Sequence, residues 1–374
     1  MNSLVALDMP ASQKFVGALR SIWDSGDAAL PIDQRLPQHA RRKLVEQFGA
    51  SAVIEGDNLR TELSGGKPVE QGDALVVATS GSTAEPKGVV HTHGSIGAAV
   101  LASGGRLKCS SHDHWLACLP LAHVGGLSVV LRALHFGSIL TVSNRADQKT
   151  FLDAVDRGAT MTSLVPTVLQ SVDISKFRTV LIGGAQAPDE LPSNAISTYG
   201  LTETMGGVVY DGVPLEGVEV QVADDSEILI RSETLLRCYR DGTCPTTKDG
   251  WLPTGDLGEM TDGRLSVHGR RDELINTGGY KVWPKTVETS ITNIDGVADC
   301  VVRGLADEKW GSVVSAWIVL ADPKVRLNLD DVRRHVRQSL PDYCAPNKMF
   351  IVDQIPRSTM GKVQVSELLK LKTV

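Results

Sequence analysis

Between residues 74 and 184 the chain alternates short apolar runs with longer segments that have helical spacing. Such an alternation needs crossover connections, which place the strands in a mostly parallel sheet covered by helices. Several of the predicted strands end in Gly, Ser or Thr, and open α/β sheets bind ligands at the carboxyl ends of their strands. The predicted strands are residues 74–79, 114–120, 138–143, 160–165 and 179–184, and the predicted helices between them include 94–102, 124–134 and 147–158.

The remaining parts of the chain have other patterns. Residues 12–24 have the spacing of an amphipathic helix, and residues 218–232 alternate around an acidic turn as a hairpin does. Residues 250–269 read as further short strands joined by Asp-Gly turns. We therefore predict an α/β protein with two domains. The large domain, 1–270, has mostly parallel sheets covered by helices and a small strand-rich subdomain, and the small domain, 271–374, is α+β.

Composition excludes several classes of protein. A chain of 374 residues with 42% hydrophobic and 22% charged residues can bury a core and is not disordered. The net charge of −6 argues against nucleic acid as a partner. The six cysteines form no C-x-x-C pair, which favours reduced thiols in the cytoplasm. The N-terminus lacks a secretory signal and no apolar run approaches about 18 residues, so we expect no membrane insertion.

The strongest local feature is the segment ATSGSTAEPKGVVHTHG at residues 78–94. Backbone N–H groups, hydroxyls and one ammonium directly after a strand can cradle a polyphosphate. A Walker A loop is excluded because Pro86 precedes Lys87 and Gly88 follows it. A flexible Ser/Gly linker is the alternative. The candidate phosphate-binding residues are Thr79, Ser80, Gly81, Ser82, Thr83 and Lys87.

TSGSTAEPKG resembles the phosphate loop of the adenylate-forming superfamily (acyl-CoA synthetases, luciferases and adenylation domains), with Ala84 where glycine is usual. Six further segments resemble motifs of this superfamily in the same order along the chain. The resemblance implies activation of a carboxylic acid by ATP and Mg²⁺, followed by transfer to a thiol such as CoA, and it also allows a homodimer. The segments are CLPLAHVGGL (118–127), VLIGGAQAP (180–188), STYGLTET (197–204), PTGDLG (253–258), GRRDELINTGGYKVWPKTVE (269–288) and PRSTMGKVQ (356–364).

The resemblance also implies roles for individual residues. Lys362 is the expected catalytic residue, since its charge would stabilise the transition state between the α-phosphate and the carboxylate. Thr202 is expected to bond a phosphate oxygen, and Glu203 to hold Mg²⁺, a hard cation that prefers oxygen ligands. Each of these side chains could instead be a solvated surface group. Further nucleotide contacts are expected from Gly183, Gly184, Ala185, Tyr199, Gly200, Asp256 and Arg270.

The acyl pocket, the hinge and the thiol channel complete the expected site. Asp272 corresponds to the hinge between the domains, and Gly278 and Gly279 to the loop that shapes the thiol channel. Two positions depart from the family pattern: Asn276 replaces a usual lysine and Val365 a usual arginine. The expected acyl-pocket residues are His123, Gly126, Arg132, Met205 and Gly206, although His123 could equally be a structural histidine.

Other chemistries fit the sequence less well. The pairs His91/His93 and His112/His114 are H-x-H, but no nearby carboxylate or cysteine completes a zinc site. Ser95 lies in HGSIG, which lacks the first glycine of a hydrolase nucleophile elbow.

The region before the phosphate loop is short for the superfamily, and PLAHVGGLSVVLRAL (120–134) resembles the short o-succinylbenzoate–CoA ligases of menaquinone biosynthesis. Their substrate is a diacid, so one carboxylate must be held without reacting, and Arg132 or Arg178 could supply a bidentate partner. Another acid:CoA ligase, an adenylation enzyme that loads a carrier protein and a nucleotide-binding module without turnover stay open as alternatives.

Overall fold

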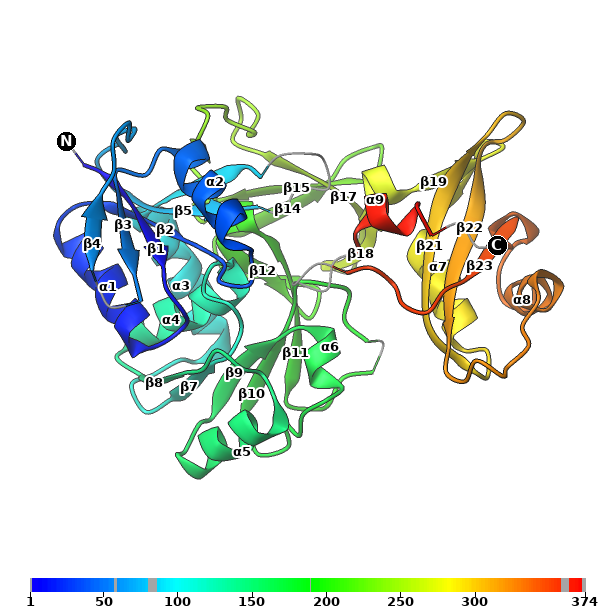
Figure 1. The fold of residues 1–374 in the computed structure, drawn as a ribbon, viewed down its shortest axis with the longest axis horizontal. Coiled ribbons are helices and arrows are strands. Elements are labelled where there is room, and N and C mark those ends of the chain that lie inside the picture. Colours follow the sequence, from blue (N-terminus) through cyan, green and yellow to red (C-terminus); the bar gives the residue numbers. More distant parts are fainter. Residues whose placement is uncertain (1, 57–58, 80–85, 189, 358–362, 372–374) are drawn as a thin grey trace. The chain divides into compact units, whose positions relative to one another are not determined.

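A computed structural model describes residues 2–56, 59–79, 86–188, 190–357 and 363–371 (Figure 1). Contacts within the chain divide it into two compact units. Unit 1 comprises Met1–Gln221, Leu229–Thr254 and Met260–Leu265, and unit 2 comprises Val222–Ile228, Gly255–Glu259 and Ser266–Val374. The boundary predicted at 270/271 is one between domains that move independently, which this division by contacts does not test, so it stays a prediction.

The first sheet of unit 1 has the strand order β16-β6-β5-β2-β1-β3-β4. β1 lies parallel to β2 and β3, β2 lies parallel to β5, and β4, β6 and β16 pair antiparallel with their neighbours. Helix α2 (Gln38–Phe48) packs its apolar side chains on the core of this sheet. The strands are β1 (Leu4–Asp8), β2 (Ala28–Pro31), β3 (Ala52–Glu55), β4 (Arg60–Glu62), β5 (Asp73–Ala78), β6 (Gly88–Thr92) and β16 (Cys238–Tyr239).

The second sheet of unit 1 has the order β13-β12-β11-β10-β9-β7-β8. It is parallel from β8 to β11 and antiparallel at β12 and β13. The strands are β7 (His114–Ala117), β8 (Ile139–Val142), β9 (Met161–Leu164), β10 (Thr179–Ile182), β11 (Ala195–Leu201), β12 (Gly206–Tyr210) and β13 (Val213–Pro214).

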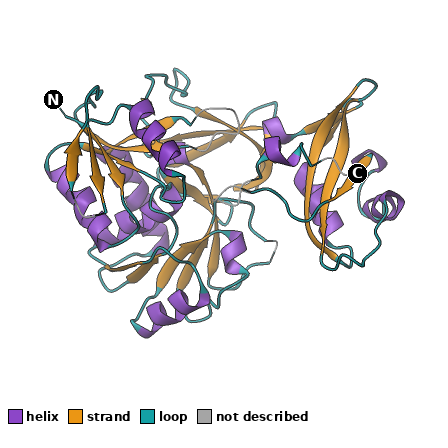
Figure 2. Ribbon diagram, viewed as in Figure 1, coloured by secondary structure: helices purple, strands orange, loops and turns teal. Residues whose placement is uncertain are grey.

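Helices cover both sheets (Figure 2). Helix α3 contacts β6 of the first sheet and β12 of the second, and α4 packs on α3 and on the second sheet, so this helical layer separates the two sheets. The side chain of Ser12 caps α1 by accepting a hydrogen bond from the Phe15 N–H, and the predicted helix at 12–24 is confirmed. The helices of this unit are α1 (Gln13–Asp24), α3 (His93–Leu107), α4 (Val124–Phe136), α5 (Gln148–Asp156) and α6 (Pro166–Leu169), in addition to α2.

A third, four-stranded sheet has the order β14-β15-β17-β18. Its first two strands, β14 (Val218–Val222) and β15 (Glu227–Ser232), are the predicted hairpin around the acidic turn. The next segment forms two long strands, β17 (Leu252–Thr261) and β18 (Arg264–Arg270), where we predicted several short ones. The single turn between them has positive φ at Asp262 and Gly263, as a tight hairpin turn requires.

Unit 2 contains a five-stranded sheet of order β20-β19-β22-β21, with β23 pairing parallel to β22. Asn328 caps α8 by accepting from the Asp331 N–H at 2.9 Å. The helix ends at Val336, and its buried residues are Val332 and Val336. The elements are β19 (Ile275–Thr277), β20 (Tyr280–Val282), α7 (Pro284–Thr292), β21 (Val297–Asp307), β22 (Gly311–Leu320), α8 (Leu329–Val336), β23 (Lys348–Ile351) and α9 (Val365–Leu368).

The strand–helix alternation was predicted to begin at residue 74, and this start is wrong. It begins at β1, and the short runs LVALD and AALP were too brief to indicate strands. β6 was also missed, so the predicted phosphate loop leads into a strand before it reaches α3. Among the described residues no helix is long and apolar enough to cross a membrane.

Candidate active site

The predicted phosphate-binding segment connects the antiparallel strands β5 and β6. The Thr79 N–H donates to the Lys87 carbonyl at 2.8 Å, and the Lys87 N–H donates to the Thr79 hydroxyl at 3.3 Å. These two bonds hold the ends of the two strands together. The predicted phosphate ligands Ser80, Gly81, Ser82 and Thr83 lie outside the described residues.

Thr202 and Glu203 lie in a short 3-10 helix, Thr202–Thr204, between β11 and β12. The Leu236 N–H donates to the Glu203 carbonyl at 2.8 Å, which ties this helix to the segment leading into β16. Any side chain at Gly200 would run into the carbonyl of Gly206, so the approach of the two strands requires glycine there. The backbone that carries the expected metal-binding carboxylate is therefore held both at Gly200 and at the Glu203 carbonyl.

Tyr239 of β16 brings the two predicted phosphate and metal groups together. Its hydroxyl donates to Oε1 of Glu203 at 3.0 Å. The ammonium of Lys87 lies 4.6 Å from the centre of its ring, within the range of a cation–π contact. Tyr239 was not among the predicted site residues.

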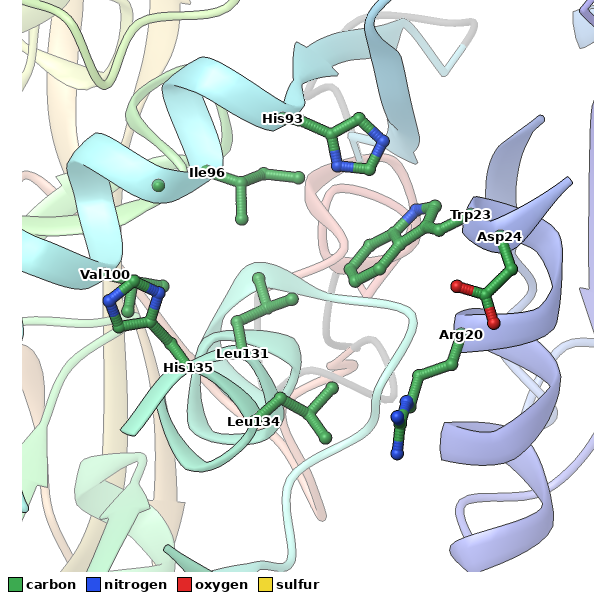
Figure 3. A pocket seen from close by; sticks show the side chains of 10 residues that line it. Arg20, Trp23, Asp24, His93, Ile96, Val100, Leu131, Leu134 and His135 are labelled. Atoms are coloured by element: carbon green, nitrogen blue, oxygen red, sulfur yellow. The ribbon is translucent and has the colours of Figure 1, made fainter. Parts of the chain in front are cut away.

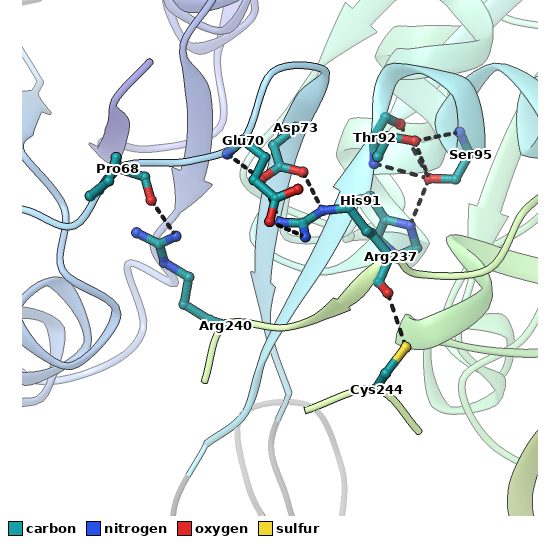
Figure 4. Close-up of polar contacts among 9 residues, drawn as sticks. All are labelled: Pro68, Glu70, Asp73, His91, Thr92, Ser95, Arg237, Arg240 and Cys244. Atoms are coloured by element: carbon teal, nitrogen blue, oxygen red, sulfur yellow. Dashed lines mark hydrogen bonds and ion pairs between the residues drawn. The ribbon is translucent and has the colours of Figure 1, made fainter. Parts of the chain in front are cut away.

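His91 of β6 is fully buried and contacts the same 3-10 helix, Thr202–Thr204. Its Nε2 lies 2.8 Å from the Thr202 carbonyl, which can only accept, so Nε2 carries the proton (Figure 4 shows the neighbouring contact with Ser95). Burial lowers the pKa of His91 to about 4, against the opposing effect of the Thr202 bond. His91 lies on a strand and His93 begins α3, so the H-x-H pair is not on one strand face.

This buried histidine predicts a pH-dependent stability. The pKa of His91 is about 4 in the folded protein and about 6.5 when unfolded, so the unfolded state binds more protons between these values. Its contribution is complete above about pH 6.5 and falls by about 3 kcal/mol as the pH drops to 4. Urea unfolding from pH 7.5 to 4 should show a shallower pH dependence for His91→Gln, whose amide donates without titrating. Equal slopes for the two proteins would contradict this assignment.

Five of the predicted nucleotide-contacting residues lie where two parallel strands of the second sheet end. Gly183, Gly184 and Ala185 follow β10, and Tyr199 and Gly200 belong to the adjacent β11. Gly184 has a φ of +81°, and a side chain at Gly183 would collide with the Thr198 hydroxyl. The backbone here therefore follows a path that requires glycine, at the sheet edge where open α/β folds bind ligands.

In unit 2 two of the predicted nucleotide contacts, Asp256 and Arg270, pair with each other. Nη1 of Arg270 donates to Oδ1 of Asp256 at 3.2 Å, and Nε of Arg270 lies 3.8 Å from Asp272. Asp256 is 7% exposed. Asp272 lies in a 3-10 helix, Arg271–Glu273, at the predicted hinge.

The predicted thiol-channel glycines form the turn between β19 and β20. Gly278 and Gly279 both have positive φ, 57° and 86°. A side chain at Gly278 would run into the ring of Trp310. Glycine is thus needed twice in this turn, for its conformation and for the close approach of Trp310. The predicted catalytic residue Lys362 lies outside the described residues.

Two of the residues predicted for the acyl pocket, Arg132 and Met205, line a small cavity in unit 1. Its volume of about 10 Å³ is close to that of a single water-sized sphere, so an aromatic acid would enter only after its walls move. Gly206 follows Met205 in the chain and has a φ of +114°. Gly126 lets α4 approach the carbonyls of the segment before it. The lining residues are Ala99, Val100, Ser103, Ser128, Leu131, Arg132, Met205 and Gly207.

Arg132 is the most unusual charge in this cavity. It is 3% exposed and makes no ion pair with any described residue. Its guanidinium makes two long hydrogen bonds, to Ser103 at 3.5 Å and Ser128 at 3.4 Å, and stacks over Trp115 at 4.8 Å. Its buried Nε has no hydrogen-bond partner among the described residues. Because buried charges are normally paired, this guanidinium is suited to an incoming anion.

The other two predicted candidates in this region are already paired. Arg178 donates to Asp113 at 2.6 Å and is 45% exposed. Nε2 of His123 donates to Asp33 at 3.1 Å. Burial would raise the pKa of Asp33, but hydrogen bonds from His123 and Arg35 outweigh it and hold the pKa far below its usual range. These contacts favour a structural role for His123.

A second and larger cavity lies elsewhere in unit 1, between α1, α3 and α4 (Figure 3). It measures about 320 Å³ and is open to solvent. Its polar groups, Arg20, Asp24, His93 and His135, are exposed side chains at its mouth. None of the predicted site residues lines it, and it shares only Val100 and Leu131 with the acyl cavity.

No group of three or more His, Cys, Asp or Glu side chains within the described ranges could enclose a metal by itself. Magnesium commonly uses one or two carboxylates together with substrate phosphates. Glu203 could supply such a carboxylate, since the Tyr239 hydroxyl donates to one of its two oxygens, Oε1.

Two family models match the chain: one described as AMP-binding enzyme over residues 66–240, and one described as AMP-binding enzyme C-terminal domain over residues 286–362. A probable 2-succinylbenzoate–CoA ligase from Mycobacterium tuberculosis is 36% identical over 340 residues, which cover 84% of this chain and 88% of that protein. This chain belongs to the AMP-binding enzyme family. The superfamily predicted from the sequence is confirmed.

Solved structures of AMP-binding enzymes share the fold of this chain. The o-succinylbenzoate CoA synthetase (MenE) from Bacillus subtilis in complex with the acyl-adenylate intermediate OSB-AMP has a TM-score of 0.87 and 26% identity, over 98% of this chain and 88% of that one. The same enzyme with ATP and magnesium has a TM-score of 0.86, at 26% identity over 98% and 89% of the two chains. The predicted α/β fold class is confirmed.

Proposed function

We propose that this AMP-binding enzyme is an ATP- and Mg²⁺-dependent 2-succinylbenzoate–CoA ligase that serves menaquinone biosynthesis. Carboxylate and ATP give the acyl-adenylate and pyrophosphate, and CoA then gives o-succinylbenzoyl-CoA and AMP. The mycobacterial relative is named as a ligase of this kind, and the Bacillus subtilis structure carries this acyl-adenylate.

The observation that carries the substrate assignment is the buried guanidinium of Arg132, which makes no ion pair with any described residue. A diacid that reacts through one carboxylate leaves the other charged, and burying that charge is costly without a partner. Arg132 offers such a partner, whereas Asp113 already neutralises Arg178. We therefore assign Arg132 to the carboxylate on the aromatic ring, while the succinyl carboxylate attacks the α-phosphate.

The remaining groups have roles in charge neutralisation and orientation. Joining a carboxylate to a phosphate brings two anions together, so positioning and positive charge matter more than acid–base chemistry. Magnesium, when bound, would neutralise charge on the phosphates. Lys87 and the phosphate loop would hold the phosphates, Glu203 would hold the metal, and Lys362 would stabilise the developing charge. Asp256 and Arg270 are proposed for the ribose.

The thiol that accepts the acyl group and the cellular location of the enzyme are inferred as well. We take CoA as the thiol, with the loop at Gly278 and Gly279 shaping its channel. All six cysteines are free thiols, which fits a cytoplasmic enzyme. The proposal that the enzyme forms a homodimer is based only on its resemblance to the adenylate-forming superfamily.

ATP–pyrophosphate exchange tests the first half-reaction. Exchange should depend on 2-succinylbenzoate and stay at background with benzoate or succinate. Adding CoA should then consume the adenylate, whereas a phosphopantetheinyl carrier protein should not. Exchange with benzoate but not with 2-succinylbenzoate would refute the substrate assignment and leave the family unchanged.

The proposed hinge predicts a separation of the two half-reactions. Proline at position 272 would fix φ and remove the backbone N–H where a large rotation is needed. Asp272→Pro should therefore keep acid-dependent pyrophosphate exchange and lose most thioester formation. Asp272→Ala is the matched control, since it keeps a flexible backbone. A wild-type rate of thioester formation in Asp272→Pro would show that no rotation at this residue is needed.

A further inference from the structure

We propose that Tyr239 is a positioning residue for adenylation, which holds Glu203 and Lys87 ready for the magnesium and phosphates of ATP. This inference rests on the proposed function and adds a residue to it. The phenol donates to one oxygen of Glu203 at 3.0 Å, while the ring faces the ammonium of Lys87 at 4.6 Å. One side chain thus contacts both charged groups expected at the triphosphate.

The position of Tyr239 is fixed by the strand that carries it. On one side, Arg237 forms a two-pronged ion pair with Asp73, which is 1% exposed. On the other, the guanidinium of Arg240 donates to the carbonyls of Phe48, Lys67 and Pro68 (Figure 4 shows the bond to Pro68). The ring itself packs against a small apolar cluster, Val89, Leu236 and Leu252. These contacts therefore fix the positions of both the hydroxyl and the ring face of Tyr239.

Because Tyr239 contacts both Lys87 and Glu203, these two opposite charges stay available for phosphate and metal. A lysine and a glutamate in direct contact would neutralise each other, and neither would be free for phosphate or metal. The ring holds the ammonium by a cation–π contact, and Lys87 makes no ion pair within the described part of the chain. The hydroxyl occupies Oε1 of Glu203 and leaves the second oxygen for the metal.

The contribution of the phenol can be isolated. The backbone of the Glu203 loop is held by His91 and Leu236, so Tyr239→Phe removes the hydrogen bond to Glu203 and keeps the ring, the cation–π contact and the loop. Thr243→Ala is the matched control. It removes a hydroxyl-to-carboxylate hydrogen bond of 2.7 Å, to Asp241, on the exposed turn that follows Tyr239.

The test uses Mn²⁺ in place of Mg²⁺ with the full-length chain and ATP, without acid or CoA. Free Mn²⁺ is counted by its electron paramagnetic resonance signal, and metal-free ATP binding is measured by calorimetry with EDTA. Tyr239→Phe should weaken Mn²⁺ binding to the ATP complex roughly tenfold, as loss of a group supporting a metal ligand does, and leave metal-free ATP affinity within about twofold. Thr243→Ala should match the wild type in both.

A second comparison separates positioning from a general structural effect. In a Glu203→Gln background, Tyr239→Phe should cause no further loss of Mn²⁺ affinity, because it acts through the carboxylate. Equal Mn²⁺ affinity in Tyr239→Phe and wild type would overturn the positioning role, and so would a parallel loss of metal-free ATP binding. If the wild-type chain binds no ATP at all, the proposed function fails and the positioning role with it.

Discussion

Arg132→Met is expected to lower kcat/KM for 2-succinylbenzoate by about 10²- to 10³-fold, because loss of one partner of a buried charge pair costs about 3–4 kcal/mol. The same variant should act on 4-oxo-4-phenylbutanoate, which has the succinyl arm but no ring carboxylate, within about threefold of the wild-type rate. The ratio of the two values is the diagnostic quantity, since a general defect would lower both.

The stability of Arg132→Met should not fall together with its activity. Arg132 is a buried charge whose Nε has no partner, so replacing it with a similar apolar side chain should leave the free energy of unfolding unchanged or raise it. Such a gain in stability with a loss of function is typical of a binding group.

Arg178→Met is the matched control. Arg178 already pairs with Asp113, which is 6% exposed, so its removal should destabilise the fold and leave the substrate ratio unchanged. If Arg178→Met changes the ratio and Arg132→Met does not, the carboxylate anchor has been assigned to the wrong arginine.

Lys362→Ala is expected to lower acid-dependent pyrophosphate release by about 10²- to 10³-fold, as removal of one group that stabilises transition-state charge does. Thioester formation from chemically supplied acyl-adenylate should stay within about threefold of the wild type, because that step no longer forms the bond to phosphorus. The two half-reactions are measured separately, by pyrophosphate release and by thioester yield.

Lys370→Ala serves as its control. Lys370 is an exposed lysine near the same terminus that pairs with Glu367, and its loss should change neither half-reaction. Equal losses in both half-reactions of Lys362→Ala would remove that residue from the adenylation step.

Much of the fold could be predicted because its strands repeat a simple pattern. The segments that become β5, β7, β8, β9 and β10 are apolar runs, and the predicted helices that became α3, α4 and α5 separate the first four of them. β1 and β2 were missed because apolar runs of four or five residues do not distinguish a strand from a helix.

The site was predicted only where a motif or a local pattern carried it. Arg132 and Arg178 could not be separated by sequence, since the difference lies in Asp113, which pairs with one of them in space. Tyr239 and His91 were missed for a related reason. Their roles arise when β16 pairs with β6, which is far away along the chain, and when both strands contact the Glu203 loop.

The most direct test of the proposed function is mass spectrometry of one reaction that contains 2-succinylbenzoate, ATP, Mg²⁺, CoA and the full-length chain. We predict o-succinylbenzoyl-CoA, AMP and pyrophosphate in equal amounts, and none of them when the acid is omitted. Absence of this thioester, together with a CoA ester of benzoate or a fatty acid in parallel reactions, would contradict the proposed function.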